Sequence, residues 1–123
     1  MTCIHASKLL AGAVLVFFEA AAWAQDFPSR QITIIVPFPA GGGNDLFGRL
    51  IGQKLSTAFG RAVIVDNRPG ASGNIGTETV VRSAPDGHTL LYTTSVIATS
   101  VALYSKLAFD PQRDLAPVSM TAL

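Results

Sequence analysis

The chain has 123 residues, a formal net charge of +1 and a hydrophobic content of 49%. This nearly neutral balance gives no long-range field for nucleic acid and no polybasic face for a membrane surface. Cys3 is the single cysteine and precedes the first apolar stretch, so the rest of the chain excludes a disulfide framework, thiol catalysis and a thiolate metal site.

Residues 1–24 have the pattern of a secretory signal peptide. Lys8 supplies a short basic region, residues 9–18 form an apolar core, and residues 22–24 (AWA) fit the small-x-small cleavage pattern. We expect cleavage near Ala24, export to the periplasm and no stable membrane insertion afterwards, because the apolar core is too short to span about 30 Å of hydrocarbon. The alternative is a buried N-terminal helix.

A buried strand and an amphipathic helix are predicted to open the folded part of the chain. Residues 31–36 (QITIIV) are a β-branched run, which is typical of a parallel strand covered on both faces. Residues 44–59 carry apolar side chains mostly four apart, which predicts the helix. Asn44 is the expected N-cap, Asp45 lies favourably in the first turn, and Gly60 is expected to end the helix.

The remaining elements alternate in the same way. In chain order they are a strand over 62–65, a glycine-rich loop over 67–75, a helix over 75–84 stopped by Pro85, a strand over 88–94, a loop entering a short helix over 96–104, and an irregular segment from 109. Residues 115–123 are interpreted as a fourth strand or a crossing linker.

The order strand–helix–strand–helix–strand with short connections predicts an α/β fold, a parallel sheet with flanking helices. In such sheets, ligands bind beyond the carboxyl ends of the strands. Three loops lie at that edge in the predicted topology, residues 37–44, 67–74 and 94–99, and all are rich in glycine or small hydroxylated residues. We therefore expect the binding site at this shared edge.

The first loop is the main candidate for binding an anion. Its proposed ligand residues are Phe38, Pro39, Ala40, Gly41, Gly42, Gly43, Asn44 and Asp45. Adjacent glycines leave backbone N–H groups open at a helix N-terminus, where partial positive charge favours an anion. Neither a Walker loop nor a G-x-G-x-x-G fingerprint is present, and the alternative is a turn that binds nothing.

Asp45 competes with an anionic ligand for the same helix end. We therefore expect its carboxylate to cap backbone N–H groups, or to accept a hydrogen bond from a hydroxyl or ammonium group of the ligand. It has no evident partner for acid–base catalysis.

Asn74, Thr94 and Ser95 are the candidate ligand residues of the other two loops. Asn74 is also a suitable N-cap for the following helix, and nearby Asn67 and Arg68 either brace their loop or, in the case of Arg68, pair with a carboxylate.

Catalysis is not expected. His88 is separated from Ser95 by about 20 Å of extended chain, so a Ser-His-Asp triad that uses Ser95 is excluded. No ligand cluster predicts a metal, and no motif predicts a cofactor. The sequence indicates recognition without turnover.

Three phrases carry a resemblance to a known family. They are FPSRQITIIVPFPAGGGNDLFGRLIGQKL, VIVDNRPGASGNIGTETVVRSAPDGHTLLYTTS and ALYSKLAFDPQRDLAPVS. Together they cover essentially residues 27–119, and they resemble the N-terminal part of tripartite tricarboxylate transporter substrate-binding proteins, also called the Bug family. The resemblance implies an extracytoplasmic solute-binding protein with two periplasmic-binding-protein-like α/β lobes around a cleft, of which this chain supplies an incomplete first lobe.

The same resemblance implies the partners and the division of the chain. The ligand is a small carboxylate, delivered to membrane transporter subunits by a monomeric protein that is not an enzyme. Residues 25–108 correspond to the first lobe and residues 109–123 to the start of a hinge or crossover toward a second lobe. Residues 38–45 match one of two loops that grip the carboxylate, and the region around Thr94 and Ser95 matches another loop that lines the cleft.

Some residues depart from the family pattern. Asn44 stands where the family often has Thr or Ser, and Ser100-Val101 replaces a common Asn-Pro. The chain also ends well before the family's usual length, so it is a fragment, a pseudogene product or a short protein. Two other functions stay open: an enzyme lobe that acts on an anionic metabolite, and a truncated product that binds nothing.

Overall fold

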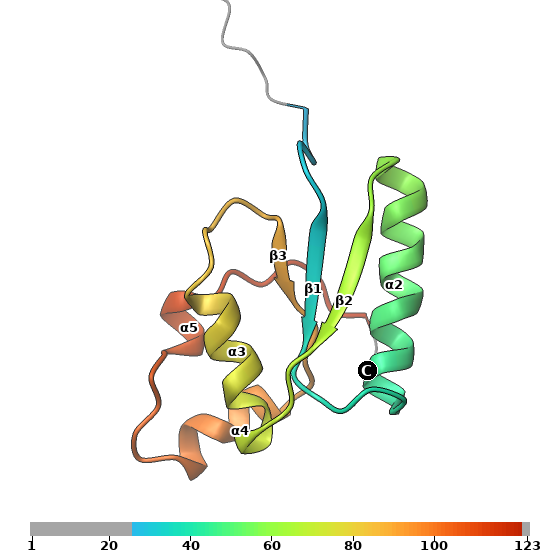
Figure 1. The fold of residues 1–123 in the computed structure, drawn as a ribbon. Helices are drawn as coiled ribbons and strands as arrows, with labels where there is room; N and C mark the ends of the chain where they lie inside the picture. Colours follow the sequence, from blue (N-terminus) through green and yellow to red (C-terminus); the bar gives the residue numbers. More distant parts are fainter. Residues whose placement is uncertain (1–25, 122–123) are drawn as a thin grey trace, which may run out of the picture.

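A computed structural model describes residues 26–121, so the predicted signal peptide lies outside the described residues. Its sheet has three parallel strands in the order β2-β1-β3 (Figure 1). The strands are β1 (Ile32–Val36), β2 (Val63–Asn67) and β3 (Thr89–Leu91). The helices are α2 (Gly43–Phe59), α3 (Asn74–Val81), α4 (Val96–Leu103) and α5 (Pro111–Asp114), with a short 3₁₀ helix at Ala71–Gly73. The predicted α/β fold is confirmed.

The central strand β1 forms the core, as its β-branched run predicts. Ile34 pairs with Val65 on one side and Leu90 on the other. Helix α2 contacts β1 and β2, whereas α3 contacts β1 and β3. The crossover through α2 leads from β1 to β2, and the crossover through α3 leads in the opposite direction, from β2 past β1 to β3. Right-handed connections then place the two helices on opposite faces of the sheet, as Figure 1 shows. The buried apolar residues are Ile32, Ile34, Ile35, Val36 and Phe109.

Helix α2 packs on the sheet through a face that the apolar pattern did not indicate. Its buried residues are Asp45, Gly48 and Gly52, while Leu46 and Phe47 are more than half exposed. A Cβ atom at Gly48 would lie 2.9 Å from Cγ2 of Val36. The helix therefore approaches the strands more closely than larger side chains would allow, and the expectation that its larger apolar residues mark the buried side is wrong.

The starts of two helices also differ from expectation. Gly42 occupies the N-cap position of α2 with extended backbone, and Gly73 occupies that of α3. Asn44 and Asn74 lie inside the helices and make no side-chain capping bond, so their predicted capping role is wrong. At the other end of α2, Gly60 adopts the predicted left-handed conformation with φ of 62°.

The segment from residue 109 onward is mainly irregular, as expected, but it contains the short helix α5 at Pro111–Asp114. Asp110 caps α5 by accepting a hydrogen bond from the Gln112 N–H, and Pro111 is the first helical residue. An aspartate N-cap followed by proline is a known start signal. Residues 115–121 form no strand, which favours the linker among the two predicted alternatives.

Candidate functional site

The three loops predicted to carry the site lie at one edge of the sheet (Figure 1). Because β1, β2 and β3 are all parallel, the segments that follow them start from the same edge.

Contacts join these loops to one another. Asn67 Nδ2 donates to the Phe38 carbonyl oxygen at 3.1 Å. A Cβ atom at Gly76 would lie 2.7 Å from Cβ of Pro37, so α3 packs directly on the start of the first loop. The Tyr104 hydroxyl at the end of α4 donates to Ser72 Oγ at 3.1 Å.

The first loop presents an open backbone at the start of α2. Pro39, Ala40 and the three glycines that follow are exposed, and a Cβ atom at Gly41 or Gly43 would meet nothing within 4 Å. The first hydrogen bond of the helix runs from the Leu46 N–H to the Gly42 carbonyl. The preceding N–H groups have no intrahelical acceptor, so a ligand oxygen can approach them.

Asp45 lies beneath this loop and caps it, as expected. Its Oδ2 accepts hydrogen bonds from the Gly41 N–H at 2.9 Å and from Arg49 Nε at 3.0 Å, and the residue is only 5% exposed. The Gly41 N–H, and after it the Arg49 guanidinium, hold the pKa of the Asp45 carboxyl below its ordinary value of 3.8. The carboxylate is therefore ionised, and the cation beside it offsets the charge that would repel an anionic ligand.

Of the other predicted ligand residues, Thr94 and Ser95 are exposed and Asn74 is half-buried. All three follow their strands at the same edge. Thr94 Oγ1 accepts a hydrogen bond from the Val96 N–H at 3.5 Å, and the Ser95 carbonyl accepts one from Ala98, so both also shape the start of α4.

Asn67 is the last residue of β2, and its side chain braces the first loop through the bond to Phe38, whereas it was expected to brace its own loop. Arg68 pairs with the neighbouring Asp66 at 2.9 Å. The sequence analysis missed Arg49, although its position four residues after Asp45 on a helix was a signal for an ion pair.

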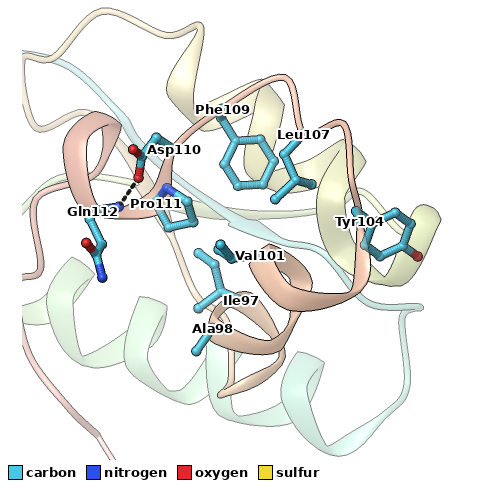
Figure 2. Close-up of a pocket in the computed structure, with 9 residues that line it drawn as sticks. All are labelled: Ile97, Ala98, Val101, Tyr104, Leu107, Phe109, Asp110, Pro111 and Gln112. Atoms are coloured by element: carbon cyan, nitrogen blue, oxygen red, sulfur yellow. Dashed lines mark hydrogen bonds between the residues drawn. The ribbon is translucent and has the colours of Figure 1, made fainter.

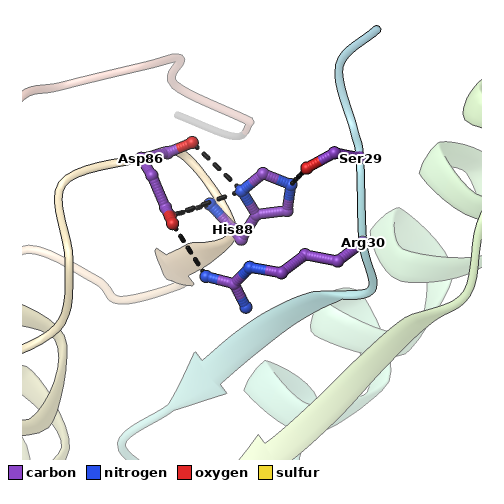
Figure 3. A network of polar contacts seen from close by, with 4 residues as sticks. All are labelled: Ser29, Arg30, Asp86 and His88. Carbon is purple, nitrogen blue, oxygen red and sulfur yellow. Dashed lines mark hydrogen bonds and ion pairs between the residues drawn. The ribbon is translucent and has the colours of Figure 1, made fainter. Parts of the chain in front are cut away.

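A second polar cluster lies at the opposite edge of the sheet (Figure 3). The buried His88 ring has Nε2 at 3.5 Å from Ser29 Oγ and Nδ1 at 3.3 Å from Asp86 Oδ1. Sequence reasoning considered only Ser95 beside this histidine. Arg30 donates to Asp86 Oδ2 at 2.8 Å, and the Phe27 ring lies edge-on to His88. These contacts connect the segment before β1 to the turn before β3. We call the cluster of Phe27, Ser29, Arg30, Asp86 and His88 the clasp.

A cavity of about 590 Å³ lies between α4 and the segment leading into α5 (Figure 2). Its lining is mainly apolar and contains none of the predicted ligand residues. Two of its polar side chains already have hydrogen-bond partners, since Asp110 accepts from the Gln112 N–H and Tyr104 donates to Ser72. This lining suits an apolar group better than a carboxylate.

Membrane-spanning helices and metal-binding clusters are both absent from the described residues. Between positions 26 and 121, no helix has the length and apolar character needed to cross a bilayer. The same residues contain no group of three or more His, Cys, Asp or Glu side chains placed to hold a metal ion.

Comparisons with known proteins agree with the fold. Residues 47–123 match the model of the tripartite tricarboxylate transporter family receptor. The chain is 44% identical to a UPF0065 protein of Bordetella bronchiseptica over 90% of its own length and 33% of the relative. It is 41% identical to protein BugT of Bordetella pertussis, covering 79% of the chain and 30% of that protein. The chain thus spans about a third of the length of these curated relatives.

Solved structures show the same likeness. MatC from Rhodopseudomonas palustris with bound malate is 37% identical, with a TM-score of 0.65 over 72% of this chain and 30% of that chain. A second R. palustris protein, solved with adipate, is 36% identical, with a TM-score of 0.63 over 71% and 29%. The periplasmic binding protein BugD is also similar, at 40% identity and a TM-score of 0.51 over 53% of this chain and 22% of that chain. This chain belongs to the tripartite tricarboxylate transporter receptor family, and its relatives include Bug-type proteins.

Proposed function

We propose that the chain is part of a periplasmic solute-binding protein that captures a small carboxylate for a tripartite-type membrane transporter and does not transform it. The observation that carries this proposal is the exposed glycine loop before α2, where no side chain limits the approach of a ligand to the backbone at the carboxyl edge of the sheet. Family membership and the malate and adipate in two similar structures support the ligand class.

The proposed ligand residues are those of the first loop, residues 38–45, together with Asn74, Thr94 and Ser95. Backbone amides at the start of α2 that are not bonded to Asp45 hold the carboxylate oxygens, and the hydroxyl and amide side chains contact the rest of the ligand. In this proposal residues 25–108 belong to the first lobe, while residues 109–123 begin the connection to a second lobe that closes on the ligand. Residues 1–24 direct export and are removed.

Titration of the chain with adipate, L-malate and neutral adipamide tests the proposal. Calorimetry is expected to show binding of the acids and none of adipamide, which has the same carbon chain without the charges. In ¹H–¹⁵N spectra, the acids are expected to shift the amide signals of residues 41–45. Acid-induced shifts confined to the cavity between α4 and α5, or no binding of either acid, would contradict it.

A further inference from the structure

We propose that Arg49 and Asn67 are positioning residues that set the shape of the first loop by closing a ring of hydrogen bonds around it. The inference deepens the proposed function and rests on it for its effect on ligand affinity. The ring itself is a property of the free protein.

The ring can be followed atom by atom. Asp45 Oδ2 accepts from the Gly41 N–H at 2.9 Å and from Arg49 Nε at 3.0 Å. Arg49 Nη2 donates to Asn67 Oδ1 at 3.3 Å, and Asn67 Nδ2 donates to the Phe38 carbonyl at 3.1 Å. The backbone from Phe38 to Gly41 closes the circuit. Side chains from α2 and from the end of β2 therefore hold both ends of this short stretch.

The loop depends on such bonds because it has few of its own. Among the described residues, no backbone-to-backbone hydrogen bond involves residues 38–41. The glycines that follow have the largest conformational freedom of any residue type. A loop fixed before the ligand arrives loses less entropy on binding, so the ring raises affinity by preorganisation.

The two side chains have the chemistry that the ring requires. The planar guanidinium of Arg49 reaches two acceptors through different nitrogens, whereas a lysine offers one compact charge. The amide of Asn67 accepts from one neighbour and donates to the other, which an aspartate in its ionised form cannot do. Asn67 stands opposite Val36 in the register of the sheet, so the strand pairing brings it beside the first loop.

Arg49→Lys and Asn67→Asp, made in the whole chain, test the proposal. The first keeps the positive charge and loses the two-acceptor link, and the second keeps the acceptor for Arg49 but replaces the donor to Phe38 with a negatively charged oxygen. Arg82→Lys is the matched control, because Arg82 pairs with Glu78 at the same spacing on α3, away from the loop.

Amide hydrogen exchange at residues 41–43 and calorimetric titration with adipate and L-malate are the measurements. Both test variants are expected to exchange faster at these glycines and to bind the acids about tenfold more weakly, the size of one lost hydrogen bond. Arg82→Lys is expected to match the wild type in both respects. Thermal unfolding separates a loop effect from a global one, and Asn67→Asp serves alone if Arg49→Lys does not fold.

The outcomes separate this inference from the proposed function. If residues 41–43 exchange their amide hydrogens at the wild-type rate in both test variants, the ring does not set the shape of the loop, even if the acids bind well. Faster exchange with unchanged affinity overturns its positioning role. If the wild type binds neither acid while the glycines respond to both substitutions, the ring stands and the proposed function fails.

Discussion

At the carboxyl edge of the sheet the chain turns through exposed glycines, whereas at the amino edge side chains from two segments bond to each other (Figures 1 and 3). The first edge is held by close backbone packing, as at Gly76 against Pro37, and by the ring around the first loop. The second edge is held by the clasp, where Arg30, Asp86 and His88 interact through their side chains. The contrast fits the proposed function, in which the carboxyl edge admits a ligand while the clasp fastens the amino edge.

The largest expected effect comes from adding a methyl group at Gly76. Its Cβ atom would lie 2.7 Å from Pro37 Cβ and 2.8 Å from the Arg68 carbonyl oxygen, and neither neighbour is the free end of a side chain. Gly76→Ala is therefore expected to destabilise the protein by about 2 to 3 kcal/mol. Urea unfolding measures this change.

Gly52→Ala is the matched control, since Gly52 is also a buried helical glycine. Its Cβ atom would meet nothing closer than 3.6 Å. Greater helix propensity is expected to stabilise this variant by up to about 1 kcal/mol. Equal effects of the two substitutions would show that close packing at Pro37 does not hold the carboxyl edge.

A smaller effect is expected at Gly41, where conformation rather than space is limiting. Its φ of 84° lies in the left-handed region, although a Cβ atom there would meet nothing within 4 Å. Gly41→Ala is expected to cost about 1 kcal/mol of stability and to weaken acid binding through a displaced loop. Gly43→Ala, with the same open surroundings and no positive φ, is expected to leave urea unfolding nearly unchanged. A loss at Gly43 equal to that at Gly41 would contradict this explanation.

Local patterns in the sequence predicted a large part of this architecture. The β-branched run of β1, the glycine that ends α2 and the shared edge of the three loops all follow from composition and element order. The buried face of α2 did not follow from the sequence. Apolar spacing shows which side of the helix carries Leu46 and Phe47, but it does not show that Gly48 lets the helix approach the sheet closely through another side. Asn44 and Asn74 were assigned as caps by residue type, but glycines one or two positions earlier take that place.

The exposed glycine loop of the candidate site could be predicted from the sequence, whereas the side chains that hold this loop in place could not. The glycine loop is visible in the sequence because its residues are adjacent. Arg49 and Asn67 are 18 residues apart, and they meet only because β2 pairs with β1 in a particular register. The clasp likewise joins Ser29 to His88 across 59 residues. Interactions of this kind depend on the folded topology.

The smallest predicted effect is a change in folding stability at low pH, caused by the clasp. The bond from Arg30, and after it the His88 N–H, lower the pKa of Asp86 from 3.8 to about 2. Because the folded-state pKa is below the ordinary value, the ionised carboxylate stabilises the fold above pH 3.8, and this contribution is lost as the pH falls toward about 2. Arg30→Gln is expected to raise this pKa and to flatten the fall in urea stability across that interval.

Arg61→Gln is the control for this experiment, because Arg61 makes no ion pair within residues 26–121. It is expected to keep the wild-type acid profile. Asp45 also has a lowered pKa, so part of the acid dependence persists in both variants. Arg30→Gln should bind adipate as the wild type does, since the clasp lies at the edge opposite the loop. Weaker binding in this variant would mean that the two edges are coupled through β1, and that fastening one end of the sheet helps to shape the other.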